Sequence, residues 1–150
     1  MTTICTLDCA DRQPFDNPSL RSAKVWNERA SVKIVIHGAE NLNDQHSCYV
    51  LVRTIEDKPT SATTYAQSVE LAKNPDESVK AVDVLLPGQT SELSVSLPKQ
   101  GQLVVEALLR SPDPSAWRVY VPAGTREIEI QVTERRACVV RPATGQECDR

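Results

Sequence analysis

Short apolar runs and polar turns alternate along the chain from residue 31 onward. In residues 31–37, Val32, Ile34 and Ile36 occupy every second position, the period of a β-strand with one face in a core. Residues 48–55 (CYVLVRTI) are apolar on both faces, as expected for a central strand that is covered on both sides. Further runs of strand length, separated by turn residues, cover residues 78–86, 92–97, 102–109, 116–121, 126–133 and 137–140.

One segment departs from this pattern. In residues 63–73, Tyr65, Val69 and Ala72 recur at helical spacing, and Asn74 with Pro75 supplies a stop signal. The sequence therefore predicts an all-β fold, a two-sheet β-sandwich of about seven to eight strands with a short helical insertion. No repeat of fixed period is present, which disfavours a propeller or a solenoid.

The predicted strands define one domain, residues 31–141. Residues 1–30 contain Pro14 and Pro18 among polar residues and have no sustained period, so we expect an irregular leader or tether there. Residues 142–150 are expected to form a C-terminal tail. A chain of 150 residues is of ordinary length for a single domain, and a second core is not expected.

Composition narrows the class of protein. Aromatic residues make up only 4% of the chain, so the core is expected to consist of Val, Leu, Ile and Ala. The net charge is −3, from 17 basic and 20 acidic residues, and without a basic cluster we expect no nucleic-acid partner. No apolar run reaches the roughly 18 residues that a membrane-spanning helix needs.

Cysteine content suggests an oxidising compartment. Five cysteines are many for a reduced cytosolic domain of this size, and four of them lie near the two ends of the sequence. Two disulfides and one free thiol are expected, but the spacing leaves the connectivity open. The possible disulfide cysteines are Cys5, Cys9, Cys48, Cys138 and Cys148.

Candidate catalytic or metal-binding chemistry is limited to one group. His37, His46 and Cys48 lie within twelve residues of one another and could supply transition-metal ligands or a thiol with a base. They lack a CxxC or HxxxH spacing, and the alternative reading makes both histidines loop or edge residues and Cys48 structural. Nucleotide-binding and hydrolase motifs are absent from the sequence, so we expect no catalysis, no cofactor and no metal.

Two segments are candidates for contact with another protein. The first is the connection between the first two predicted strands, which is either a recognition loop or an ordinary connector; it consists of Ala39, Glu40, Asn41, Leu42, Asn43, Asp44 and Gln45. The second is the pair Trp117 and Arg118, in which the Trp is either an interface anchor or, the interpretation we favour, a core residue that caps an aliphatic sandwich.

The order of these features resembles the outer-membrane lipoprotein family of type VI secretion systems (TssJ, VasD, SciN). The resemblance covers about residues 31–133. It rests on the first strand that leads into Leu42 and Asn43, the polar stretch and helix near Tyr65, the turn LLPGQ at 85–89, the apolar strand at 103–109, and Trp117 with Arg118 ahead of the next strand.

The resemblance implies a fold, a location and a partner. The fold would be a transthyretin-like β-sandwich with a helical insertion, held in the periplasm and tethered to the outer membrane by an acylated N-terminal cysteine. The partner would be the periplasmic region of an inner-membrane TssM (IcmF-type) protein, contacted by the loop of residues 39–45. Thr2, Thr3 and Ile4 before Cys5 do not form a lipobox, so the lipid anchor is expected outside this sequence.

A rival function of a different class remains open. A transthyretin-like or immunoglobulin-like periplasmic carrier or chaperone would bind a small ligand or a secreted subunit. A concave apolar pocket lined by convergent polar groups would favour it.

Overall fold

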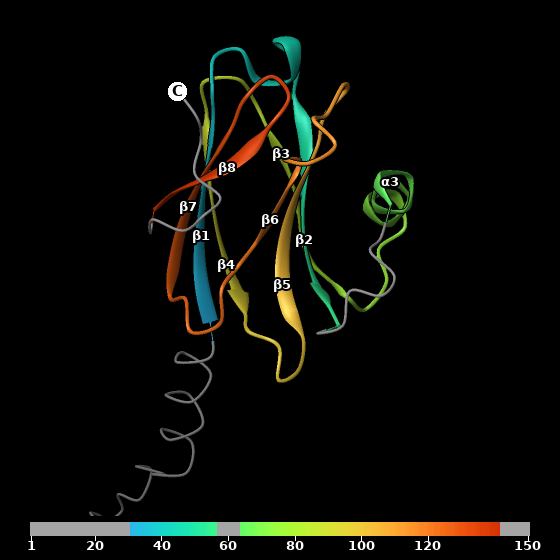
Figure 1. The fold of residues 1–150 in the computed structure, drawn as a ribbon, viewed down its shortest axis with the longest axis vertical. Helices are drawn as coiled ribbons and strands as arrows, with labels where there is room; N and C mark the ends of the chain where they lie inside the picture. The colour runs from blue at the N-terminus through green and yellow to red at the C-terminus, as the bar shows by residue number, and fades with distance from the viewer. Residues whose placement is uncertain (1–30, 57–63, 142–150) are drawn as a thin grey trace, which may run out of the picture. The chain divides into compact units, whose positions relative to one another are not determined.

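The computed structural model describes residues 31–56 and 64–141, and these residues form a β-sandwich with one α-helix (Figure 1). Two four-stranded sheets face each other. The strands in chain order are β1 (Ser31–Gly38), β2 (Cys48–Ile55), β3 (Val79–Leu85), β4 (Thr90–Ser96), β5 (Gln102–Leu108), β6 (Arg118–Tyr120), β7 (Glu127–Val132) and β8 (Ala137–Arg141), and helix α3 (Tyr65–Lys73) lies between β2 and β3. The predicted two-sheet β-sandwich with a short helix is confirmed.

The two sheets differ in their pairing. The first has the strand order β4-β1-β7-β8, and in it β1 pairs parallel with β7 and antiparallel with β4. The second has the order β3-β2-β5-β6 and is antiparallel throughout. Because β1 and β2 lie in different sheets, the loop between them crosses from one layer of the sandwich to the other.

The core lies between the sheets and follows from the alternation in the sequence. Ile128 and Ile130 on β7 are completely buried, whereas Glu127 and Glu129 lie on the outer face of the same strand. The same alternation places Val32, Ile34 and Ile36 of β1 inside. Burial of aliphatic side chains from both sheets supplies the main stabilisation of such a fold.

Strand limits agree with the sequence to within one residue except at β4, which begins two residues earlier than expected, and at β6. Residues 116–121 were expected to be a strand, but the ladder of β6 contains only Arg118–Tyr120. The backbone still pairs on both sides of it, since Ala107 N–H bonds Trp117 C=O at 2.9 Å and Val121 N–H bonds Leu103 C=O at 3.0 Å. Pro122 directly follows and has no N–H to continue the ladder.

The residues at both ends of helix α3 favour a helix boundary. The Thr64 hydroxyl accepts a hydrogen bond from Gln67 N–H at 3.2 Å, and the Gln67 side chain accepts one from Thr64 N–H at 2.8 Å, which together make a capping box. The helix ends at Lys73, ahead of Asn74 and Pro75, as predicted.

Some sequence predictions lie outside the described residues: the leader of residues 1–30, the tail of residues 142–150, and Cys5, Cys9 and Cys148. Among the residues that are described, none of the helices has both the length and the apolar character to span a bilayer.

Candidate functional site

The loop between β1 and β2 has an unusual backbone. It contains a short 3-10 turn, η3 (Leu42–Asp44), and three consecutive residues in the left-handed region: Asn43 (φ 48°), Asp44 (φ 56°) and Gln45 (φ 64°). This conformation is costly for residues with a side chain, and Asn and Asp tolerate it best. It persists only where surrounding contacts impose it.

Two residues that the sequence placed in the recognition loop are internal. Leu42 is completely buried and belongs to the core cluster between the sheets, and Asn43 is 3% exposed. Leu42 is therefore not an exposed contact residue of this loop, because its side chain packs in the core between the sheets. The exposed members of the loop are Glu40, Asn41, Asp44 and Gln45, and we call these four residues the tip surface.

Asn43 imposes the shape of the loop. Its side-chain amide donates to Ser47 C=O at 2.8 Å, and its carbonyl oxygen accepts from Arg110 N–H at 2.6 Å. Its own N–H reaches Thr133 C=O at 3.3 Å. One buried side chain thus connects the β1–β2 loop with the β5–β6 loop, while its backbone connects to the β7–β8 loop.

The β3–β4 turn joins the same end of the sandwich. Gly38 N–H bonds Gln89 C=O at 2.8 Å, and Gly88 N–H bonds Gly38 C=O at 2.9 Å. A Cβ at Gly38 would lie 2.6 Å from the Leu86 carbonyl oxygen, so only glycine permits this approach. Four loops are therefore held together beneath the tip surface (Figure 1).

Charged groups border the tip surface. The Arg110 guanidinium contacts His46 Nδ1 at 3.0 Å and lies 4.0 Å from the Asp44 carboxylate. His46 Nδ1 also lies 2.7 Å from the Asp44 carbonyl oxygen. The result is a polar, pre-shaped surface that can form hydrogen bonds and ion pairs with a partner.

The structure separates the residues of the suggested metal or thiol site. His37 lies on the outer face of the first sheet, where its ring nitrogens contact Thr90 Oγ1 and Glu129 Oε1, both at 3.0 Å. Cys48 is a free thiol buried in the core, and burial raises its pKa to about 12. A neutral thiol is a poor nucleophile and metal ligand. Within residues 31–56 and 64–141, no group of three or more His, Cys, Asp or Glu side chains is arranged to hold a metal ion.

Cysteine positions are only partly described. Cys48, one of the five cysteines considered for disulfides, is instead a free thiol in the core cluster. Cys138 is buried on β8, with its Sγ 3.6 Å from Gln131 C=O. The expected pairing of the terminal cysteines stays a prediction.

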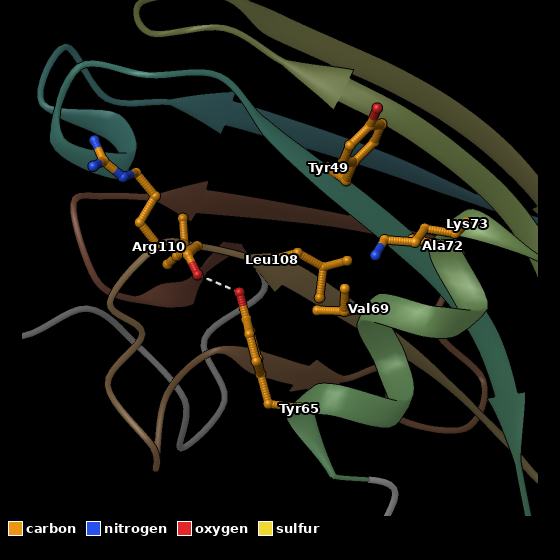
Figure 2. A pocket seen from close by; sticks show the side chains of 8 residues that line it. Tyr49, Tyr65, Val69, Ala72, Lys73, Leu108 and Arg110 are labelled. Atoms are coloured by element: carbon orange, nitrogen blue, oxygen red, sulfur yellow. Dashed lines mark hydrogen bonds between the residues drawn. The ribbon is translucent and has the colours of Figure 1, made fainter.

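A second surface feature is an apolar groove between α3 and the outer face of the second sheet. Its volume is about 660 Å³. Figure 2 shows Tyr65 and Val69 on the helix side, Tyr49 and Leu108 on the sheet side, and the Tyr65 hydroxyl donating to the Leu109 carbonyl oxygen. The remaining lining residues are Ala72, Lys73, Leu109 and Arg110.

A buried ion network lies on the same face of the second sheet. Arg53 on β2 makes a bidentate contact to the Glu106 carboxylate on β5, at 2.9 and 3.1 Å. Arg118 on β6 reaches the same carboxylate at 2.8 Å. Glu106 is completely buried and the Arg53 side chain is 5% exposed. This network was not predicted from the sequence, although Arg53 and Glu106 are opposite charges within two otherwise apolar strands and could have indicated it.

Trp117 packs beside this network and not between the sheets. It is buried, as expected, but it is not part of the core cluster. Its ring meets Tyr65 edge to face, with centroids 5.1 Å apart, and the Arg118 guanidinium lies 4.3 Å above it. Trp117 is therefore buried, as predicted, and its contacts with Tyr65 and Arg118 fix the helical insertion to the sandwich.

A known protein family matches this sequence. The model of the family described as IglE, N-terminal domain, matches residues 49–132, which is more than half of the chain. The chain belongs to the IglE N-terminal domain family. A search of curated protein sequences finds no significant match to this IglE-family domain.

Solved structures show the same sandwich. The type VI secretion lipoprotein TssJ1 from Pseudomonas aeruginosa is 24% identical, with a TM-score of 0.57 over 77% of this chain and 99% of that chain. Serratia marcescens Lip, a membrane-bound component of the type VI secretion system, is 15% identical, with a TM-score of 0.58 over 77% and 99%. A chain in the structure of the TssM C-terminal domain from EAEC is 17% identical, with a TM-score of 0.58 over 75% and 98%. The predicted resemblance to the TssJ family is confirmed.

Proposed function

We propose that this IglE-family domain is a structural component of a type VI secretion envelope complex. The observation that carries the proposal is the family match, supported by the shared fold of TssJ1 and Lip, both of which are described as components of that system. The domain would act in the periplasm, tethered to the outer membrane by a lipid on the natural N-terminus, as an adaptor and not as an enzyme.

The partner we propose is the periplasmic region of a TssM (IcmF-type) inner-membrane protein. The structural neighbours include a chain from the structure of a TssM C-terminal domain and one from a type VI membrane complex. The contact would be made by the tip surface, Glu40, Asn41, Asp44 and Gln45. Leu42 and Asn43 support this surface from below.

Rigidity favours recognition at the tip surface. A loop that is already held in its bound shape loses little conformational entropy on binding. Hydrogen bonds from Asn43 and close packing at Gly38 hold this loop in the free domain. Its exposed carboxylates, Glu40 and Asp44, favour basic or amide-rich partner residues, since opposite charges steer association.

The test is a binding titration against the periplasmic region of the cognate TssM-type protein. Asn41→Arg places a large side chain on the tip surface at a residue with φ −93°, where no special backbone is required. We expect saturable binding by the wild type and a loss of at least about tenfold, or ~1.4 kcal/mol, in the variant. The matched control is Gln100→Arg in the β4–β5 loop, at the opposite end of the sandwich, which should leave the affinity unchanged.

Substitution of Leu42 would not answer this question, because a charge in the core would unfold the domain whether or not the loop binds a partner. A folded wild type that does not bind would exclude the adaptor function and favour the periplasmic carrier. Equal losses in Asn41→Arg and Gln100→Arg would exclude the tip surface as the contact.

A further inference from the structure

The groove between α3 and the second sheet has a preformed apolar interior. Tyr65 and Val69 of the helix oppose Tyr49 and Leu108 of the sheet across about 660 Å³ (Figure 2). The helix is fixed in place by the Tyr65 hydroxyl, which donates to Leu109 C=O, and by the contact of Tyr65 with Trp117. The groove therefore exists before any ligand arrives, which lowers the entropic cost of binding.

Exposed apolar side chains extend this surface onto β3. Tyr49 is 54% exposed and pairs in register with Val84, which is 50% exposed, and the neighbouring Val82 and Leu86 are also exposed. The outer face of the first sheet is different, because it carries Lys33 with Glu92 and Glu127, and His37 with Glu129. A contiguous apolar patch of this kind is typical of an interaction site.

The charged side chains that line this groove have one sign, although each lies near an exposed carboxylate. Lys73 and Arg110 are the charged residues among those that line it, and both are basic. Figure 2 shows Lys73 at the C-terminal end of α3 and Arg110 at the other end, near the β1–β2 loop. Their present partners are weakly held: Glu70 lies 3.7 Å from Lys73 and Asp44 lies 4.0 Å from Arg110, and all four side chains are more than half exposed. Exposed pairs of this kind are readily exchanged for another carboxylate.

We propose that this groove binds an acidic, apolar peptide segment of a protein partner, at a site that adjoins the tip surface at Arg110 but includes none of its four residues. A bulky apolar side chain of the segment would lie between Val69 and Leu108, and flanking carboxylates would pair with Lys73 and Arg110. The opposite charge of the segment follows from the basic residues at both ends of the groove. The apolar side chain follows from its lining.

The experiment uses a random peptide library displayed on phage, selected against the folded domain. The enriched peptides should combine Asp or Glu with a large apolar residue. A synthetic copy of the most enriched peptide is then titrated by fluorescence polarisation. We expect its Kd to rise by at least about tenfold in Val69→Glu and in Lys73→Glu, and to rise between about 50 and about 300 mM salt because the contact includes ion pairs.

The matched control is Lys99→Glu, which makes the same charge change on an exposed turn outside the groove, and it should bind like the wild type. Lys73 is exposed, so its substitution keeps the fold, which circular dichroism verifies. Failure of the library to enrich acidic, apolar sequences would overturn the proposal. Equal binding by both groove variants would also overturn it, as would binding of dodecanoate without binding of peptide, which would assign the groove to a small amphiphile. Asn41→Arg should retain peptide binding, so this result is independent of the tip surface.

Discussion

At the scale of single residues, the second sheet carries a buried carboxylate that is shared by two guanidinium groups. Glu106 accepts hydrogen bonds from Arg53 and Arg118 on the two strands beside it, and the three side chains are largely shielded from water. Charged hydrogen bonds of this kind are strong, but desolvation of the ions offsets much of the gain. The network should therefore affect stability most clearly when one member is removed and the remaining ions lose a counter-charge.

Replacement of Glu106 by Gln should destabilise the domain strongly. The amide keeps the shape of the side chain but removes the buried carboxylate charge that faces Arg53 and Arg118, so both guanidinium groups lose a close counter-charge. We expect the free energy of unfolding to fall by about 3–5 kcal/mol. The measurement is urea denaturation followed by circular dichroism.

The control for this prediction is Glu92→Gln on β4. Glu92 pairs with Lys33 at 3.7 Å, but both side chains are about half exposed or more. Loss of such a pair should cost less than about 1 kcal/mol. Similar effects of Glu106→Gln and Glu92→Gln would show that the network carries no special energetic weight.

At the scale of elements, the sequence predicts what depends on local pattern and misses what depends on distant partners. The buried face of strand β7 could be predicted from the sequence, because the alternation of its residues alone decides which face is buried. The capping box of Thr64 and Gln67 marks the start of α3 and is local as well. The burial of Leu42 could not be predicted from the sequence, because the shape of its loop depends on a distant partner. Asn43 in this loop accepts a hydrogen bond from Arg110, which is 67 residues away. A polar loop therefore contributed a core residue.

Asn43 and Asn41, both in the β1–β2 loop, allow a buried and an exposed asparagine to be compared. Asn43→Ala removes two hydrogen bonds, leaves Arg110 N–H and Ser47 C=O without that partner, and puts alanine at φ 48°. We expect a loss of about 2–4 kcal/mol in the free energy of unfolding from the unsatisfied groups and the strained backbone. Asn41→Ala, at an exposed residue with φ −93°, should change it by less than about 0.5 kcal/mol. Chemical denaturation of both variants checks this, and equal stabilities would mean that Asn43 does not organise the loop.

At the scale of the whole described body, stability is unevenly distributed. The core cluster contains residues from the strands of both sheets and Leu42 of the loop, and among the described residues none of its members belongs to α3. The helix is attached from outside, chiefly by the contacts of Tyr65 with Trp117 and Leu109. An element attached in this way is expected to open at a lower free energy than the strands beneath it. The groove along α3 is therefore bounded on one side by the core strands and on the other by a helix that is expected to open at a lower free energy than those strands.

Removal of the Tyr65 side chain should destabilise helix α3 without destabilising the core strands. Tyr65→Ala deletes the hydroxyl bond to Leu109 C=O and the edge contact to Trp117, while the inter-sheet core is untouched. We expect amide hydrogen exchange, measured by mass spectrometry, to accelerate in α3 and to stay unchanged in β1 and β7. Ile130→Ala is the contrasting variant, because a cavity in the core should lower the free energy of unfolding by about 2–5 kcal/mol and accelerate exchange in the strands as well. If Tyr65→Ala instead exposed β1 and β7 as much as α3, the helix would be part of the cooperative core, and the groove would be as rigid as the sandwich itself.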